Sequence, residues 1–445
     1  MRRLLSTFAM AALVAVTACQ TQPQDPGPDT DTPSPDGVEC EEGFCVLSGT
    51  ITESLTLTAD TAWLLRGGVF IGDDANETVL TIEPGTVVYG ESSTRGMLVV
   101  TRGSKIEAEG TADNPIVFTS SKAEGERARG DWGGVIINGR APVNGCDESP
   151  CESFGEGGTG FYGADQDDDN SGTLKYVRIE FAGSLISPDN ELNGLALQGV
   201  GRGTVLDYIQ IHMGADDCIE FFGGTAEAKH ILCTGTADDN LDWTDGWQGK
   251  LQFFVARQYD DAGDNGIEAD NNGEDNTALP RSHPILSNIT LVGVPGSDAS
   301  DIGMLIREGT AAEIHNALVL GWGEVCLDID HDETFANAVD EQGQPTGDLV
   351  IANSYFDCET LYDEEAEDLF AISEFVNDLN EGNVEESPNL EAPYGDTPDF
   401  RPASGSGALT GAVVPDVAFF DQVDFKGGVD PLNDWTVGWT IDVRN

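Results

Sequence analysis

Short runs of alternating hydrophobic and polar residues make up most of the chain between about residues 46 and 358. They are separated by glycine-containing turns and have the length of β-strands rather than of helices. Early examples lie at residues 51–57, 78–82, 86–89, 97–101 and 116–119. The pattern predicts an all-β protein of many short strands, which leaves a sandwich, a barrel, a propeller or a solenoid.

An internal sequence repeat distinguishes among these architectures. Residues 174–183, 206–214 and 230–235 each have the pattern of a strand that ends in a turn, and related units follow at 251–258, 288–293 and 316–321. The period of roughly 22–35 residues is that of one coil of a β-solenoid. Because one coil cannot bury its apolar side alone, stacked coils would share one core. We therefore predict a right-handed parallel β-helix over residues 40–358.

The amino-terminal pattern differs from the rest. Arg2 and Arg3 precede an apolar run that ends near Val16, which is typical of a signal peptide over residues 1–18 and too short to span a bilayer. Cys19 follows small residues, as in a bacterial lipobox, and would be lipidated with acyl chains such as palmitate. An ordinary signal peptide with an incidental cysteine is the alternative.

Residues 19–39 are rich in Pro, Asp and Thr, so we predict that they form the lipidated end and a solvated tether. Gln20 after Cys19 resembles the sorting pattern of outer-membrane lipoproteins. The expected partner is thus a membrane, reached through the lipid anchor, with either the periplasmic or the outer face possible.

Residues 359–445 are predicted to form a C-terminal capping region. Apolar positions within 361–386 favour a short amphipathic helix that covers the open end of the solenoid. Its apolar face would contain Leu361, Leu369, Phe370, Ile372, Phe375 and Val376.

The formal net charge of −59 excludes nucleic-acid binding through phosphates. Nine cysteines leave an even number once Cys19 is set aside, which favours disulfides in an exported chain. Proximity in sequence predicts two local loops, and we expect the other two bonds to link one coil to the next. The predicted pairs are Cys40 with Cys45, Cys146 with Cys151, Cys218 with Cys233, and Cys326 with Cys358.

Eight stretches resemble bacterial cell-surface β-helix proteins, and most closely a family of acidic outer-membrane lipoproteins. They are residues 81–89, 108–119, 130–139, 169–180, 242–247, 266–272, 400–411 and 434–440. The resemblance covers nearly the whole chain after the tether. It implies a parallel β-helix and an envelope location, but no reaction.

Aligning the coils places acidic residues in columns. Asp216, Asp238, Asp264 and Asp301 share one turn position, Asp217 and Asp239 lie beside the first two, and Glu220, Asp242 and Glu268 fall four places after the first column. Stacked carboxylates repel unless hydrogen bonds or cations offset the charge. Oxygen-rich clusters suit Ca²⁺, while a solvated acidic face explains the same residues without a metal. The predicted ligands are Asp217, Asp239, Asp242, Asp264, Glu268 and Asp301.

A second candidate calcium site lies in residues 167–172, where Asp167 and Asp169 take the first and third positions of an EF-type loop. Position twelve would be Arg178 instead of glutamate, so this segment is not an EF-hand. An ordinary turn is the alternative.

Two hypotheses about function follow. The chain is a surface binding or structural protein that engages a glycan or an envelope protein, with Trp243 and Trp247 either as an aromatic platform or as core residues. Alternatively, it is a lipid-tethered polysaccharide lyase or glycoside hydrolase, because many β-helices have those activities, with Lys250, Arg257 or Arg307 near the acids. Sparse Lys and Arg favour binding.

Overall fold

The computed structural model of the protein describes residues 36–146, 149–187, 190–366, 368–395 and 397–444. The predicted signal peptide, Cys19 and all of the tether before residue 36 lie outside these described residues. Within the described ranges, no helix has the length and apolar character needed to cross a membrane. Residues 35–445 form one compact unit, which is described here by itself.

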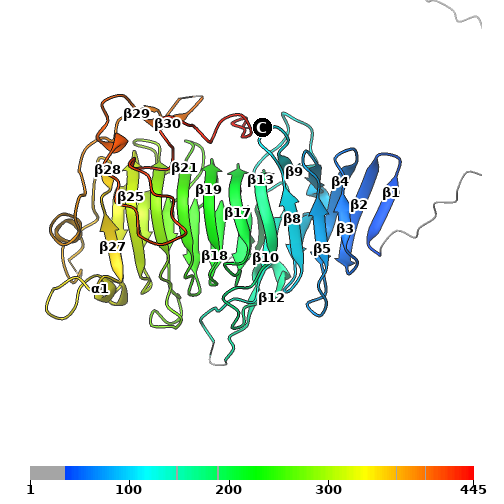
Figure 1. The fold of residues 1–445 in the computed structure, drawn as a ribbon, viewed down its shortest axis with the longest axis horizontal. Coiled ribbons are helices and arrows are strands. Elements are labelled where there is room, and N and C mark those ends of the chain that lie inside the picture. The colour runs from blue at the N-terminus through cyan, green and yellow to red at the C-terminus, as the bar shows by residue number, and fades with distance from the viewer. Residues whose placement is uncertain (1–35, 147–148, 188–189, 367, 396, 445) are drawn as a thin grey trace, which may run out of the picture. The chain divides into compact units, whose positions relative to one another are not determined.

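Parallel strands stack in three ladders along this unit, as the arrows of Figure 1 show. The ladder called sheet 1 takes one short strand from each coil, together with the second halves of β2 (Phe44–Ile51) and β4 (Ala62–Ile71). Its short strands are β7 (Met97–Val100), β10 (Gly134–Asn138), β16 (Leu195–Gln198), β18 (Ile219–Phe222), β20 (Leu241–Thr244), β22 (Ile267–Ala269), β24 (Ile302–Ile306) and β26 (Val325–Ile329).

Long strands that bend in the middle form the other two ladders. They are β13 (Gly172–Glu180), β17 (Val205–His212), β19 (Glu227–Thr234), β21 (Lys250–Arg257), β23 (Ile285–Val292) and β25 (Ala312–Leu320). Separate strands take these places in the outer coils: β3 (Leu55–Leu57), β5 (Val79–Ile82), β6 (Val87–Gly90), β8 (Lys105–Glu109), β9 (Ile116–Ser120), β27 (Leu349–Ala352) and β28 (Tyr355–Asp357). A 3-10 turn, η1 (Ser92–Thr94), follows β6, and β1 (Val38–Glu41) pairs antiparallel with β2. The predicted fold class, a parallel β-helix, is confirmed.

The bend of each long strand is a residue in the left-handed region, with φ between 49° and 61°. These residues stack from coil to coil: Tyr176, Tyr208, His230, Phe253, Asn288, Asn316 and Asn353. A non-glycine residue in this conformation costs about 1–2 kcal/mol. Ring stacking offsets that cost at the first bends, where the centroids of Tyr176 and Tyr208 are 4.5 Å apart and those of Tyr208 and His230 4.1 Å.

Alternation along the sheet 1 strands decides which side chains enter the core. In β18, Ile219 and Phe221 are fully buried inside the coil, so Glu220 points outward. The same parity buries Leu241 and Trp243 and turns Asp242 outward in β20. The interior is one continuous cluster from Val38 to Val376. All four predicted disulfide pairs are present.

Two insertions cover part of the outer face of sheet 1. The first, residues 145–164, contains β11 (Ser153–Gly155), the turn η2 (Glu156–Gly158) and β12 (Gly160–Tyr162). The second is the hairpin of β14 (Ser184–Ser187) and β15 (Asn190–Leu192). The backbone N–H of Gly157 donates to Oδ1 of Asn190 at 2.6 Å, which joins the two insertions.

The C-terminal end of the solenoid is covered by short helices, as predicted, but the helical part is smaller than residues 361–386. Among the described residues of that range, only α2 (Ile372–Glu374) and η3 (Phe375–Leu379) are helical, and α1 (Asp332–Ala338) was not foreseen. Acidic residues crowd the segment before Ile372, and the carboxylate of Glu364 accepts the N–H groups that begin α2. Ile372, Phe375 and Val376 are buried as expected, while Leu369 is 59% exposed and does not join the apolar face.

Residues 399–443 return along the bent strands, as the red ribbon in Figure 1 shows, and residues 411–443 are called the strap. The segment before it contains β29 (Leu390–Ala392), β30 (Asp399–Pro402) and η4 (Gly407–Leu409). Side-chain amides on successive coils donate to strap carbonyls at 2.7 to 2.9 Å. The donors are Gln210, Gln252, Asn288, Asn316 and Asn353. Trp439 packs edge-on against Tyr176, so the strap also covers the aromatic stack.

Candidate metal centre

The outer face of sheet 1 carries the acidic columns that the repeat predicted. Strand pairing places Glu220 opposite Asp242, and Asp242 opposite Glu268. Leu305 follows Glu268 in the same column, so the acidic part ends there. The predicted alignment of the coils is therefore confirmed.

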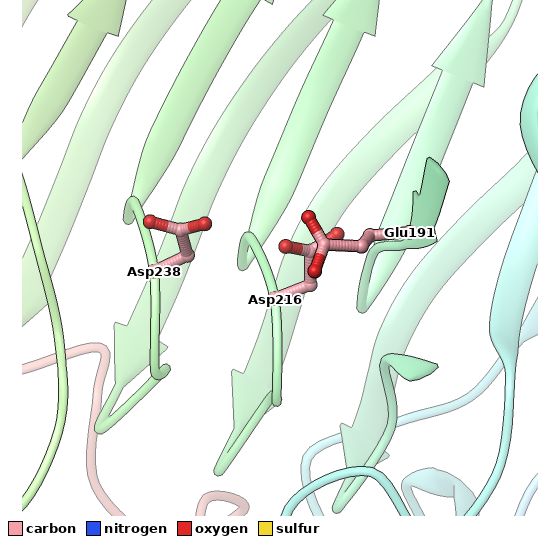
Figure 2. A group of neighbouring side chains, drawn as sticks. All are labelled: Glu191, Asp216 and Asp238. Carbon is pink, nitrogen blue, oxygen red and sulfur yellow. The ribbon is translucent and has the colours of Figure 1, made fainter. Parts of the chain in front are cut away.

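Carboxylate oxygens from neighbouring coils lie within 4.8 Å of one another in four overlapping groups of three residues. The residues of these groups are called the acid cluster: Glu191, Asp216, Asp217, Glu220, Asp238, Asp239, Asp242 and Glu268. Figure 2 shows one group, in which Glu191 reaches from hairpin β14–β15 toward Asp216 in the turn before β18, and Asp238 lies in the next turn. The cluster is thus built by coil stacking plus one insertion.

In the turns before β18 and β20, a carboxylate is held by a hydrogen bond from a backbone N–H of the next coil. Oδ1 of Asp217 accepts the N–H of Asp239 at 3.0 Å, and Oδ1 of Asp239 accepts the N–H of Asn265 at 2.7 Å. Each bond fixes one oxygen and leaves the second oxygen of the carboxylate for another partner. Coil stacking therefore positions these side chains before any ligand arrives.

Asn193 precedes Asp217 in the same turn column, but it departs from this pattern. Its side chain is buried, and its Nδ2 donates to Oε2 of Glu220. Its Oδ1 has no hydrogen-bond partner within the described part of the chain, and neither has Oδ1 of Asp242. A buried acceptor left unmatched costs about 1–3 kcal/mol, so two such oxygens beside the acid cluster point to a missing electropositive partner.

Burial and mutual repulsion raise the pKa values of the acid-cluster carboxyl groups in and before strands β18 and β20. Burial, and then the charge of Asp238, raises the pKa of Asp216 to about 8. Burial and the charge of Glu268 raise the pKa of Asp238 to about 6. Burial raises the pKa values of Asp217, Glu220, Asp239 and Asp242 well above the usual range of carboxyl groups. The cluster cannot keep all its charges without protons or cations.

Within the described part of the chain, the cation that pairs with the acid cluster is Arg307, at the end of the cluster. The guanidinium of Arg307 pairs with Oε1 of Glu268 and, at 3.0 Å, with Oδ1 of Asp270. None of the other acidic residues of the cluster forms an ion pair within 4.0 Å among the described residues. Oxygen ligands from several coils, with most of their charge uncompensated, are the donors that Ca²⁺ prefers.

We expect the metal-free protein to lose stability as the pH rises from about 5 to about 8. Groups such as Asp216 and Asp238 have folded pKa values above their unfolded values near 4. Their contribution to stability is therefore present below pH 4 and is lost as the pH rises through 6 to 8. Thermal unfolding in excess chelator across this range checks the sign. A melting temperature that rises with pH would contradict the assignment.

Asp264 and Asp301, two further predicted ligands, lie beside the acid cluster but outside its four groups. Burial, and then the charge of Asp238, raises the pKa of Asp264. Burial and the charge of Asp264 raise the pKa of Asp301 to about 6.

Asp167 and Asp169 of the segment 167–172 belong to none of the carboxylate groups found among the described residues. Asp167 pairs with the guanidinium of Arg202 at 2.9 Å, and Oδ2 of Asp169 accepts the backbone N–H of Arg140 at 3.1 Å. Since protein donors already engage both carboxylates, the case for a metal is carried by the acid cluster.

Trp243 and Trp247 do not form the aromatic platform that was one prediction for them. Both indoles have no exposed surface, and Trp247 stacks on Phe221 with ring centroids 4.0 Å apart. Parity explains the result, because Trp243 follows the outward-facing Asp242 and must point inward. A sugar ring therefore cannot stack on either side chain, and both belong to the core.

Sequence reasoning missed Glu191 and Asn193. Glu191 comes from an insertion without repeat character, so no spacing connects it with Asp216. Asn193 could have been predicted from the repeat, because the pairing of Leu195 with Ile219 makes Asn193 the counterpart of Asp217. Aligning β16 with the later coils would have added it to the turn column.

Comparison with known proteins gives one decisive match. The model of the pectate-lyase-like β-helix domain family matches residues 49–396, which is most of the chain. The chain belongs to the pectate-lyase-like β-helix domain family. No curated protein and no solved structure matches the sequence. The match includes sheet 1 and the acid cluster, so the cluster is part of this β-helix domain rather than of an appended segment.

Proposed function

We propose that the protein is an exported lipoprotein, anchored to the outer membrane through Cys19, that acts as a binding or structural protein and is stabilised by calcium at the acid cluster. The observation that carries the metal assignment is the set of overlapping groups of three carboxylates, with oxygens within 4.8 Å. The unmatched buried oxygens of Asn193 and Asp242 add to it. Calcium takes about 6–8 oxygen ligands in flexible geometry, which neighbouring coils can supply together.

Calcium is expected to raise the thermal stability of the purified protein relative to excess chelator. A ligand present at 100 times its dissociation constant stabilises the folded state by about 2.7 kcal/mol per site. Differential scanning calorimetry with calcium, magnesium and chelator measures the shift. Magnesium serves as the control, because its smaller octahedral shell fits such a cluster less well. Equal melting temperatures in all three conditions would contradict the metal assignment.

The anchor is tested separately from the metal. Growth with an alkyne analogue of palmitate should label the wild-type protein and leave Cys19→Ser unlabelled. Fractionation should then release the variant from the membrane, because acyl burial contributes about 0.8 kcal/mol per methylene group. Equal labelling of both proteins would contradict lipidation at Cys19.

Polysaccharide cleavage is the second candidate, and membership of the β-helix family favours it. Neighbouring carboxyl groups with different pKa values, such as Asp216 and Asp238, suit acid and base roles in glycoside hydrolysis. Arg307 suits a base role poorly, because Asp270 and Glu268 hold its pKa above the usual value. New reducing ends or unsaturated products from a polysaccharide, lost in Asp216→Asn, would establish the enzyme.

A further inference from the structure

Two of the five histidines of the chain meet at one carboxylate, outside the acid cluster and on another ladder. Glu313 and His315 lie on β25, in the ladder formed by the first halves of the bent strands, and His283 lies just before β23 in the preceding coil. Oε1 of Glu313 is 3.9 Å from Nε2 of His283, and its Oε2 is 3.6 Å from Nε2 of His315. Each oxygen of the carboxylate is thus close to a different imidazole.

The ladder itself brings these side chains together. Glu313 and His315 are two residues apart on one strand, so they point to the same face. That face is the outer one, because Ile314 between them is fully buried. The backbone N–H of Glu313 donates to the carbonyl of Pro284 at 3.0 Å. This bond between neighbouring coils places His283, the residue before Pro284, next to the carboxylate.

The imidazole nitrogens at this carboxylate lack hydrogen-bond partners. Nε2 of His283 and Nε2 of His315 are buried atoms without a partner within the described residues. Their distances of 3.9 and 3.6 Å to the carboxylate oxygens exceed the usual N–H···O range of about 2.7–3.2 Å. Buried polar atoms normally have partners. Two unmatched nitrogens beside one anion therefore point to a cation that all three side chains share.

The spacing of these atoms suits a tetrahedral metal ion. Zinc bonds imidazole nitrogen and carboxylate oxygen at about 2.0–2.2 Å, so the ligand atoms of one site lie about 3.4 Å apart. Both nitrogen–oxygen distances are near that value. The ligand atoms of all three residues do not lie within 4.8 Å of one another, as those of the acid cluster do, so one imidazole has to turn toward the other. The side chains of His283 and Glu313 are each 32% exposed, which gives the ring space to turn and the ion a way in.

We propose that His283, Glu313 and His315 bind one zinc ion. Two imidazoles and one carboxylate form a ligand set that zinc accepts, whereas calcium prefers oxygen ligands alone. Three protein ligands leave the fourth position of the ion for water. The ion would also link β23 to β25, which are paired strands of neighbouring coils. The inference goes beyond the proposed function and does not depend on the calcium assignment.

Isothermal titration calorimetry of zinc into the purified protein, in millimolar calcium, tests the assignment. We expect one zinc ion to bind per chain. His283→Ala and His315→Ala should each weaken its binding at least about 100-fold, because loss of a side chain that only hydrogen bonds to a metal ligand already costs about 10–100-fold. Cobalt in place of zinc should give the visible absorption of a tetrahedral ion with wild type and lose it with both variants.

His331→Asn is the matched control, because His331 is an exposed histidine outside this cluster and should leave zinc affinity unchanged. Asparagine tolerates the left-handed backbone at this position, where φ is 71°. The circular dichroism of His315→Ala, and the shift of its melting temperature with calcium, should equal those of wild type, which separates loss of a ligand from loss of the fold.

Three results would overturn the zinc assignment. They are absence of zinc binding by wild type, equal affinity in wild type and both histidine variants, and binding that Asp217→Asn removes while the histidine variants keep it. A calcium-dependent melting temperature without zinc binding would reject this site alone. Zinc binding that depends on the histidines, without any effect of calcium, would reject the calcium assignment alone.

Discussion

Asp217→Asn is expected to stabilise the metal-free protein and to destabilise the calcium-loaded protein. Asp217 belongs to two of the four carboxylate groups, and burial raises its pKa well above the usual range. Asparagine keeps an oxygen that accepts the N–H of Asp239 but carries no charge. Without metal, the substitution removes a buried acid whose charged form is disfavoured by burial and by the neighbouring charge of Asp242, so the folded state gains stability. With calcium, it removes a charged ligand.

Melting temperatures of wild type and Asp217→Asn, measured in chelator and in millimolar calcium, give the direction of the stability change in the metal-free and in the calcium-loaded protein. Asp113→Asn is the matched control, because Asp113 is exposed in a turn outside the acid cluster and should change neither value. A variant that is less stable than wild type in both conditions would indicate that Asp217 is only a structural hydrogen-bond acceptor. A variant that is more stable in both would indicate a repulsive face without a metal.

Trp247→Ala is expected to destabilise the folded protein by about 3–5 kcal/mol, the usual cost of truncating a buried aromatic side chain. The indole is fully buried, stacks on Phe221 and donates from Nε1 to the carbonyl of Ala226 at 3.2 Å. Gly249 leaves room for it, since a Cβ there would lie 2.3 Å from Nε1. The substitution therefore leaves both a cavity and an unmatched carbonyl in the middle of the solenoid.

Urea unfolding followed by circular dichroism measures the loss, and Leu279→Ala provides the comparison. Leu279 is a large apolar residue with most of its surface exposed, so its truncation should stay within about 0.5 kcal/mol of wild type. If Trp247→Ala unfolded like wild type but lost binding of a glycan, the indole would be a ligand platform after all, and the core assignment would be wrong.

The sequence predicted the features that repeat from coil to coil. Glycine-ended strands at a regular period were enough to place Glu220, Asp242 and Glu268 in one column and to pair Cys218 with Cys233. The alternation of side chains along the same strands also predicts that Trp243 is buried, because a residue next to an outward-facing carboxylate must point inward. Of the two alternatives for Trp243 and Trp247, the core is therefore correct, and the aromatic platform is wrong because it ignored the alternation of the strand.

Features that depend on insertions could not be predicted from the period of the coil repeat. Glu191 enters the acid cluster from a hairpin whose length and direction no other coil shares. The guanidinium of Arg102 lies 5.9 Å from the ring centroid of Phe161 in the first insertion, a contact between residues far apart in sequence. The strap was likewise beyond prediction, since its hydrogen bonds link Gln210 with Ile441 across the chain.

The strap also affects how the solenoid would respond to a pulling force. Coils of a solenoid contact only their neighbours, so such proteins tend to unravel stepwise from an end. Here one segment is bonded to coils from β13 to β27, which couples them into a single mechanical block. The coils between β2 and β10 lack those bonds among the described residues. Force applied from the tether side should therefore peel away the N-terminal coils first and leave the strapped part, with most of the acid cluster, as the last piece to yield.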